Sequence, residues 1–238
     1  MAISNQFDQK KADLKTRIMK SAMKKFSETS YEKTTIEAII NDCSTSKGGF
    51  YHHFQSKDDL LRTIITEYAE KLKIIVQKIV LNKKLKALEK INKIIQKTQR
   101  FKLSQQDFNL MLVKIWQRDL ISIIRSMYLD KLVVEIRPLW QQVIEQGIDE
   151  GVFNTSFPEE VAELIVHTSS LFSKKVDIAV FKENSPDKYE YVIRKIEFIE
   201  DLITRLLGLP KGAIILADVL RKNLNIFKKM LNDENIIL

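Results

Sequence analysis

A short segment around residue 50 combines hydrogen-bond donors with residues that lack bulky side chains. In chain order, and leaving out Phe50, its members are Ser46, Lys47, Gly48, Gly49, Tyr51, His52 and His53. Hydroxyl, ammonium and imidazole groups bond to base edges and phosphates, and small residues let the backbone come close to them. A glycine inside a helix costs about 1 kcal/mol relative to alanine, and close approach to another molecule would explain that cost. The segment therefore has the chemistry of a nucleic-acid contact.

The elements around this segment fit the task of positioning it. A stripe of apolar residues at helical spacing predicts a first helix over about residues 8–29. The stripe consists of Ile18, Ala22 and Phe26. Thr35 is a natural N-cap for a brief second helix. Ser46 caps the segment itself, which is too short to be stable alone and is anchored by Phe50 and Phe54. This is the plan of a helix-turn-helix, whose second short helix enters the DNA major groove.

Residues that break helices are scarce in the rest of the chain. The 238 residues include six Gly and four Pro, and none of them lies between Phe50 and Arg137. Antiparallel β-folds need frequent glycine-containing turns, and a phosphate-binding loop needs a run of glycines. We therefore expect an all-α fold, with a three-helix helix-turn-helix DNA-binding domain at residues 1–56. A larger helical domain should occupy residues 57–238.

In the larger domain, the spacing of apolar residues predicts a series of longer helices. The expected ranges are about 56–81, 85–101, 105–125, 128–150, 158–182, 187–207 and 213–231. Pro138 lies inside the fourth of these helices and should kink or split it near Ile136, because proline lacks an N–H and clashes with the preceding turn.

The positive charge is concentrated in one part of the chain. The formal net charge is +8, and residues 61–110 alone contain 12 Lys and Arg against 4 Asp and Glu. Most of this excess lies in residues 83–102, where lysines alternate with apolar residues at helical spacing. The stretch is either a solvated helix face or a contact with phosphate or another anion. Charge alone does not decide between these two interpretations.

Several classes of site are disfavoured by composition. Cys43 is the only cysteine, and two of the three histidines are the adjacent His52 and His53, which diverge by about 100° on a helix. We therefore expect no metal site, no cofactor and no catalytic residues. Cys43 is either a small buried residue or a redox switch. No apolar run approaches the roughly 18 residues of a membrane span, and no secretory signal is evident, so we expect a cytoplasmic protein without membrane contact.

The run from Thr34 to Leu61 resembles the DNA-binding signature of tetracycline-repressor (TetR) family regulators. That signature reads approximately T-T-x-x-x-I-A-x-x-A-G-V-S-K-G-T-L-Y-x-H-F-x-S-K-x-x-L. The matching positions are Thr34, Thr35, Ile39, Ser46, Lys47, Gly48, Tyr51, His53, Phe54, Ser56, Lys57 and Leu60. Among the departures, the usual turn Ala-Gly-Val is Cys43-Ser44-Thr45 here, so that Ser44 replaces a glycine that is often left-handed, and Gly49 replaces a residue that often contacts a base. The departure at Gly49 leaves the operator sequence open.

The resemblance implies roles for the residues of the segment. Thr35 would contact phosphate, and Ser46, Lys47 and Gly49 would face bases or adjacent phosphates. The DNA backbone would be held by Tyr51, His52 and Lys57, with His53 near it. Tyr51 also has an interpretation as a residue that lies partly in the core.

For the larger domain, the resemblance implies a homodimer on a palindromic double-stranded DNA operator, and a small-molecule effector pocket. The dimer would be made largely by the last long helices. Apolar stripes at 161–171 and 193–206 face either a partner or the core of a monomer. The pocket candidates, each of which has a core interpretation too, are Phe101, Phe108, Met111, Trp116, Tyr128, Trp140, His167 and Phe172. Their character favours an apolar, aromatic or acyl effector.

The sequence thus predicts a ligand-responsive transcriptional regulator, a repressor that its effector releases from DNA. Two alternatives stay open at this point. One is a helical enzyme or small-molecule carrier, although no nucleophile and base or paired carboxylates stand out. The other is a helical dimeric adaptor that does not read DNA, which a shallow salt dependence of DNA binding would reveal.

Overall fold

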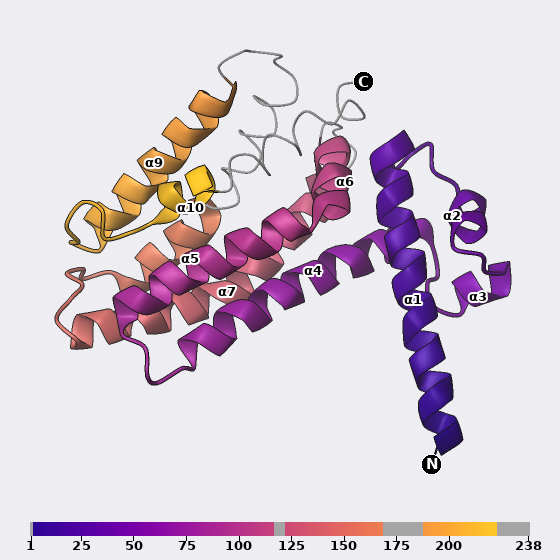
Figure 1. Ribbon diagram of the computed structural model, residues 1–238, viewed down its shortest axis with the longest axis horizontal. Coiled ribbons are helices and arrows are strands. Elements are labelled where there is room, and N and C mark those ends of the chain that lie inside the picture. Colours follow the sequence, from indigo (N-terminus) through magenta and orange to yellow (C-terminus); the bar gives the residue numbers. More distant parts are fainter. Residues whose placement is uncertain (1, 117–121, 169–187, 223–238) are drawn as a thin grey trace. The chain divides into compact units, whose positions relative to one another are not determined.

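The computed structural model describes residues 2–116, 122–168 and 188–222, and all regular structure in these ranges is helical, which confirms the predicted all-α fold (Figure 1). The helices are α1 (Ala2–Thr29), α2 (Ile36–Asp42), α3 (Lys47–Tyr51), α4 (Lys57–Val80), α5 (Ala87–Ser104), α6 (Gln106–Trp116), α7 (Ser122–Asp149), α9 (Lys188–Leu206) and α10 (Leu216–Lys222). Residues 158–168 are helical as well. None of the described helices is long and apolar enough to cross a membrane.

The chain forms two compact units. The first contains the described residues of Met1–Tyr68 and Gln105–Ile124, and the second those of Ala69–Ser104 and Arg125–Leu238. The first unit therefore includes α6 and the first half of α4 beside the three N-terminal helices. The expected division into a DNA-binding domain at residues 1–56 and a larger helical domain at 57–238 stays a prediction, whereas the packing divides α4 after Tyr68.

In the first unit, α1 is the element on which the others pack. It contacts both α2 and α6, and α2 contacts α3. Figure 1 shows α2 and α3 on the same side of α1. The predicted stripe of Ile18, Ala22 and Phe26 is fully buried, so this face of α1 forms the core of the unit. Burying such apolar surface is the main favourable contribution to folding.

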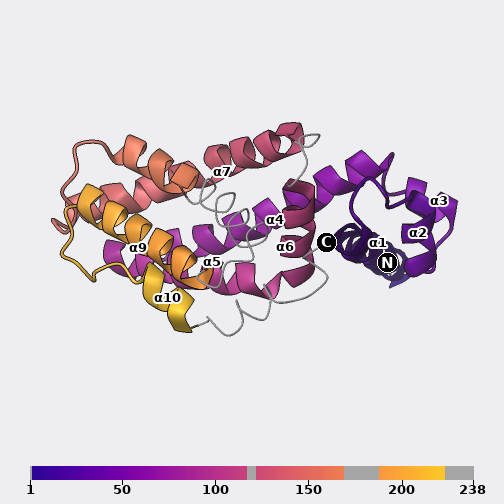
Figure 2. The same ribbon diagram turned by 90° about the horizontal axis from the view of Figure 1, so that it is seen from above.

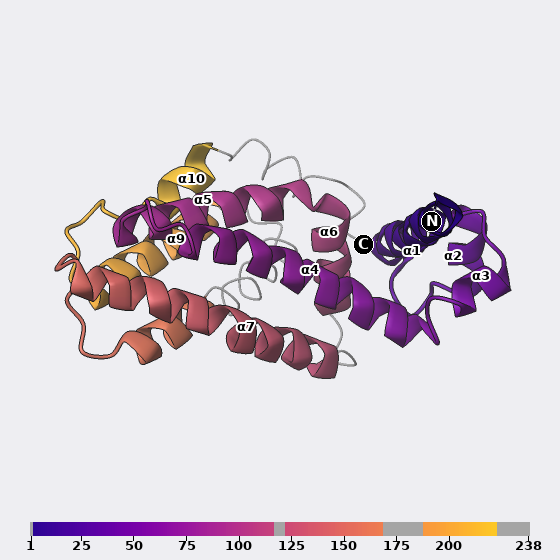
Figure 3. The same ribbon diagram turned by 90° about the horizontal axis from the view of Figure 1, so that it is seen from below.

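In the second unit, α10 packs against α5 and α9 (Figure 2). The second half of α4 lies beside α5 (Figure 3), and a buried lysine joins their ends to α7. Lys90 of α5 donates to the carbonyl of Val80 at 2.5 Å and to Oε1 of Gln146 at 2.6 Å. Burial lowers the pKa of Lys90, and these two acceptors replace the water that its ammonium group has lost.

Pro138 does not split the helix, because α7 continues from Ser122 to Asp149, and the expected kink near Ile136 stays a prediction. Proline removes the hydrogen bond to the carbonyl four residues earlier, which belongs to Val134. Val134 is exposed, so that carbonyl lies on the side of the helix where water can bind it. Arg137 also ties this part of α7 to Glu159 at 2.7 Å. A solvent-facing position therefore tolerates the proline.

Candidate nucleic-acid interface

The second helix begins where the sequence places its cap. The Thr35 hydroxyl accepts a hydrogen bond from the Ala38 backbone N–H at 3.1 Å, which satisfies one of the unpaired donors at the start of α2. Ile39 and Ile40 of this helix are buried. Thr35 itself is exposed beside the helix start, so capping leaves it accessible to another molecule.

The turn after α2 confirms the departure seen in the sequence. Ser44 has φ +51°, the left-handed conformation that glycine adopts most easily. The turn is held from α1, because Arg17 donates to the carbonyl of Cys43 at 2.5 Å. Cys43 is buried, and burial raises the pKa of its thiol, which lowers the reactive thiolate fraction. The structure therefore favours Cys43 as a small buried residue.

Helix α3 is short and is held by aromatic side chains. Ser46 caps it, accepting from the Gly49 backbone N–H at 3.0 Å. Phe50 and Phe54 are fully buried, as predicted, although Phe54 lies beyond the end of the helix at Tyr51. These two rings fix α3 against the unit and leave its opposite face to solvent.

The exposed face of α3 carries most of the predicted contact residues. Ser46, Lys47, Gly48, Tyr51 and His52 are exposed, and Gly49 and His53 are half-buried. Tyr51 keeps 53% of its surface accessible, so it is mainly a surface residue and not a core one. His52 and His53 lie edge to face at 5.1 Å. Within the described residues, no group of three or more His, Cys, Asp or Glu side chains could hold a metal ion.

The two glycines of α3 differ in what surrounds them. A Cβ on Gly48 would meet nothing closer than the Ser46 hydroxyl oxygen, at 3.8 Å. A Cβ on Gly49 would lie 2.5 Å from Oγ1 of Thr45. The absence of a side chain at Gly49 is thus explained by packing within the chain. Of the two positions, only Gly48 has free space for a side chain, and that space lies outside the protein.

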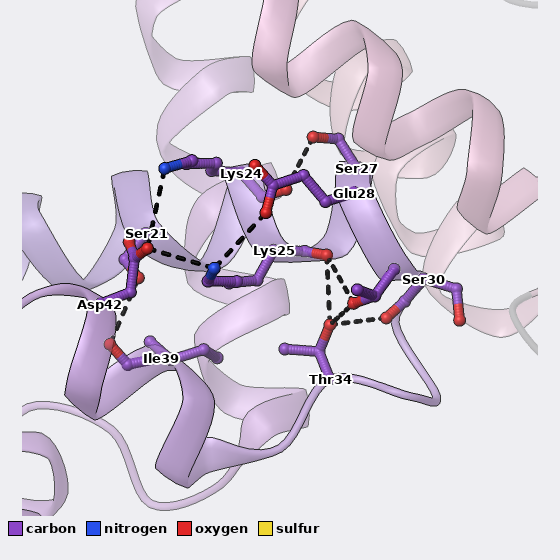
Figure 4. Close-up of polar contacts among 10 residues, drawn as sticks. Ser21, Lys24, Lys25, Ser27, Glu28, Ser30, Thr34, Ile39 and Asp42 are labelled. Carbon is purple, nitrogen blue, oxygen red and sulfur yellow. Dashed lines mark hydrogen bonds and ion pairs between the residues drawn. The ribbon is translucent and has the colours of Figure 1, made fainter. Parts of the chain in front are cut away.

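Helix α1 holds α2 through polar contacts that Figure 4 shows. The Ser21 hydroxyl donates to the carbonyl of Ile39 at 3.2 Å, and Lys25 lies 3.2 Å from the carboxylate of Asp42. Contact with the Ser21 hydroxyl and then with the nearby lysine ammonium groups holds the pKa of Asp42 below its usual value. The Thr34 hydroxyl donates to the carbonyl of Ser30 at 2.7 Å, which closes the loop before α2.

Lys57, predicted to grip the DNA backbone, makes its contacts inside the chain. Its ammonium group donates to the carbonyls of Tyr31 at 2.7 Å, Thr34 at 2.9 Å and Glu32 at 3.4 Å. It also lies 4.4 Å from the centre of the Tyr31 ring. The Tyr31 hydroxyl donates to Asp58. The pKa of Tyr31 is raised mainly by burial and secondly by this hydrogen bond. Lys57 thus fastens the loop before α2 to the start of α4.

One acidic residue that the sequence did not single out lies next to the predicted contact residues. Glu37, in the first turn of α2, is 3.1 Å from the ammonium group of Lys47. A hydrogen bond within its own residue and then the Lys47 ammonium group lower the pKa of Glu37. The place of Glu37 in the first turn of α2 predicts only a favourable interaction with the helix dipole. Nothing in the nearby sequence therefore predicts its ion pair with Lys47.

The predicted pocket residues are divided between the two units. Phe108 and Met111 are buried in the first unit, where the Phe108 ring stacks on Tyr68 at 3.8 Å. In the second unit Trp140 is buried, Phe101 is half-buried, and His167 lies 3.4 Å from Glu163. The side chains of Trp116 and Tyr128, and the whole of Phe172, lie outside the described residues. Phe108 and Met111 therefore contribute to the core of the first unit.

Comparison with known proteins identifies the class of this chain. Residues 18–64 match the family model of bacterial regulatory proteins of the tetR family, and residues 114–196 match that of the tetracyclin repressor-like C-terminal domain. The chain therefore belongs to the TetR family of helix-turn-helix transcriptional regulators, which are not enzymes. The resemblance seen in residues 34–61 is confirmed.

Three relatives illustrate how far the similarity extends. The HTH-type transcriptional regulator YerO of Bacillus subtilis is 26% identical over 208 residues, which is 84% of this chain and 67% of YerO. The HTH-type transcriptional repressor KstR2 of Rhodococcus jostii is 26% identical over 155 residues, 64% of this chain and 74% of KstR2. A TetR-family regulator structure from Syntrophomonas wolfei has a TM-score of 0.63 at 20% identity, covering 84% of this chain and 99% of that one. This last likeness concerns the fold alone.

Proposed function

We propose that the protein is a transcriptional repressor that binds a palindromic DNA operator as a homodimer, with α3 in the major groove. The observation that carries the proposal is the division of α3 into two faces. Phe50 lies fully buried on one face, and Lys47, Gly48 and Tyr51 are exposed on the other. A recognition helix needs both a locked face and a face open to base edges. That KstR2 is a repressor agrees with the direction of control.

Within this proposal, the predicted residues fall into two groups. Thr35, Ser46, Lys47, Gly48, Tyr51 and His52 are the exposed positions that would meet bases and phosphates. Gly49, His53 and Lys57 would act from behind them. Lys57 in particular would keep the loop before α2 in place, because its ammonium group is already engaged by three backbone carbonyls.

Exposed apolar residues support the dimer. On α9, Tyr191 and Phe198 are seven residues apart and therefore on one face of the helix, and both are exposed. Leu164 and Phe157, in or just before helical residues 158–168, are exposed as well. By contrast, most of the predicted stripes, such as Val161 and Ile196, are buried within one chain. The partner-facing surface would thus consist of neighbouring positions on the same helices.

The effector part of the proposal rests on the matched C-terminal domain model. An apolar, aromatic or acyl compound would bind in the second unit, where Phe101, Trp140 and His167 are the described candidates. It would release DNA by favouring a dimer geometry that binds the operator less well. A tenfold preference for that geometry changes DNA affinity by about 1.4 kcal/mol.

Fluorescence anisotropy on promoter-proximal DNA, beside a scrambled duplex and at two salt concentrations, tests this function. We expect tight binding that depends on sequence and falls steeply with salt. Lys47→Ala should weaken operator binding, whereas Lys211→Ala, an exposed lysine of the second unit, should not. Equal, weak and salt-insensitive binding to both duplexes would instead support a helical adaptor that does not read DNA.

A further inference from the structure

The Glu37 carboxylate is an unexpected group on a surface that would meet DNA. Glu37 lies two residues after the cap of α2, and its Oε1 is 3.1 Å from Nζ of Lys47, the first residue of α3. Both side chains are largely exposed, at 60% and 69%. A carboxylate here repels phosphates and neutralises part of the charge of the lysine that would contact them. Such a cost to DNA affinity calls for a compensating gain.

That gain is not stability of the fold. An exposed ion pair contributes little to stability, and the buried side chains of Ile39 and Phe50 already hold their two helices in the core. The dipole of α2 favours an acid in its first turn, but it does not account for the pairing with a cation of another helix. The pair therefore has a significance beyond holding α2 and α3 together.

The pair offers a donor next to an acceptor. Of the three donors on the Lys47 ammonium group, one is directed at Glu37 and two stay available. In the major groove, a G·C base pair presents the O6 and N7 acceptors of guanine beside the N4 donor of cytosine. Lysine pairs with the former and glutamate accepts from the latter. The two side chains together thus complement one base pair in one orientation.

We propose that Glu37 is a specificity-determining residue, which with Lys47 reads a G·C pair in each operator half-site. The proposal rests on the proposed function and deepens it. Glu37 also holds the flexible lysine stem away from phosphates, so DNA without the G·C pair gains little from Lys47. The carboxylate lowers non-specific affinity more than operator affinity, and the difference between the two affinities is specificity.

Selection of binding sites from a pool of random duplexes tests the reading of the base pair. The full-length wild type should enrich a sequence with a fixed G·C pair in each half-site. Glu37→Ala and Lys47→Ala should both make that same position degenerate, with a loss of discrimination of about fivefold or more. Glu37→Gln keeps an acceptor without the charge and should retain part of the preference for that pair.

Anisotropy on a scrambled duplex tests the charge effect separately. Both Glu37→Gln and Glu37→Ala should raise non-specific affinity about threefold, and steepen the slope of log K against log salt by about 0.9, the value of one phosphate contact. In a Lys47→Ala background the steeper salt slope should disappear, because no freed lysine can then contact a phosphate, and only the part of the affinity gain that comes from lost repulsion should remain. Glu28→Gln is the matched control. Glu28 pairs with Lys25 on α1 at 3.4 Å, and its substitution by glutamine removes one negative charge, as Glu37→Gln does.

The outcomes separate this inference from the proposed function. Wild-type protein that enriches a sequence, together with a Glu37→Ala variant that enriches the same sequence with the same non-specific affinity, would refute the role of Glu37 alone. An equal effect of Glu28→Gln would refute it too, since net charge would then be the cause. Wild-type protein that enriches no sequence would refute the proposed function, and the role of Glu37 with it. Thermal melting shows that each variant is folded.

Discussion

Ser44 adopts a backbone conformation that its side chain disfavours. With φ +51° it lies in the left-handed region, where a Cβ atom costs about 1–2 kcal/mol per residue. The residue is exposed and lies in the turn that sets α3 relative to α2. The strain is therefore local to the element that would position the recognition helix.

We expect Ser44→Gly to stabilise the protein by about 0.5–1 kcal/mol, because relief of the strain outweighs the greater freedom of glycine in the unfolded chain. Thermal melting should show a rise of a few degrees in Tm. Ser44→Ala keeps the Cβ and should show no such rise. A Tm that is unchanged by glycine, or raised equally by alanine, would mean that the left-handed conformation is not strained here.

Gly48 and Gly49 form a matched pair of adjacent residues with different surroundings. Gly48→Ala should leave the Tm unchanged or slightly raised, since its Cβ enters free space and alanine favours the helix. It should nevertheless weaken operator binding, because the added methyl group stands between the backbone and DNA. Melting and anisotropy on the same preparations measure both effects.

Gly49→Ala should first of all lower the stability of the protein, unlike Gly48→Ala. Its Cβ would lie 2.5 Å from Oγ1 of Thr45, so the Thr45 side chain or the turn must shift and the Tm should fall. Operator binding should weaken with it, in proportion to the loss of local order. If Gly48→Ala bound the operator as the wild type does, close approach of the backbone to DNA would be excluded as the reason for the glycine at position 48.

At the scale of elements, the loop before α2 depends on one cation. Lys57, the first residue of α4, donates to carbonyls 23 to 26 residues earlier in the chain. Hydrogen bonds to charged groups contribute about 1.5–3 kcal/mol when well shielded, and partial exposure reduces this value. The loop and the start of α4 should therefore form and break together.

Lys57→Met keeps the aliphatic stem and removes the ammonium group. We expect a loss of about 1–2 kcal/mol in stability and a lower Tm, with an operator salt slope that stays as in the wild type. Lys33→Met, at an exposed lysine of the same loop, should leave the Tm unchanged. A salt slope that falls by about 0.9 with an unchanged Tm would show the opposite, namely that Lys57 contacts phosphate directly.

The sequence predicts best the features that local signals determine. The caps Thr35 and Ser46 and the buried Phe50 and Phe54 follow from residue type and spacing within a few positions, and the left-handed turn at Ser44 follows from the family resemblance. These signals place α2 and α3 correctly because such short helices depend on their caps and anchors.

Features that depend on contacts between distant residues could not be predicted from the sequence. Neither the capture of loop carbonyls by Lys57 nor the pair between Glu37 and Lys47 has a signature in the chain, because each joins residues of separate elements. The split expected as one outcome at Pro138 does not occur for a similar reason: solvent exposure at Val134, which decides whether a lost hydrogen bond matters, depends on tertiary packing. The grouping of α6 with the N-terminal helices likewise arises from packing on α1.

At the scale of the whole molecule, the proposed function requires two copies of α3 on one duplex. A palindrome is read by two recognition helices about 34 Å apart, which only a dimer supplies. In the single chain, Phe198 of α9 keeps 63% of its surface exposed, and Tyr191 lies on the same face of that helix. Large exposed apolar residues of this kind mark association surfaces when they gather together.

We expect Phe198→Glu to convert the dimer into monomers, because a charge at the centre of an apolar contact loses its water without gaining a partner. Light scattering on a size-exclusion column measures the mass, and anisotropy measures operator affinity. Affinity should fall by about a hundredfold or more, since each half-site must then bind independently.

Val134→Glu is the control for Phe198→Glu: Val134 is 71% exposed on α7, and its variant should stay dimeric. Because both substitutions add the same charge to the second unit, a fall in affinity confined to Phe198→Glu would be due to dissociation and not to repulsion of DNA. A dimer that survives Phe198→Glu would place the association surface elsewhere on the chain, whereas a monomer that still bound the operator tightly would contradict the two-site reading of DNA.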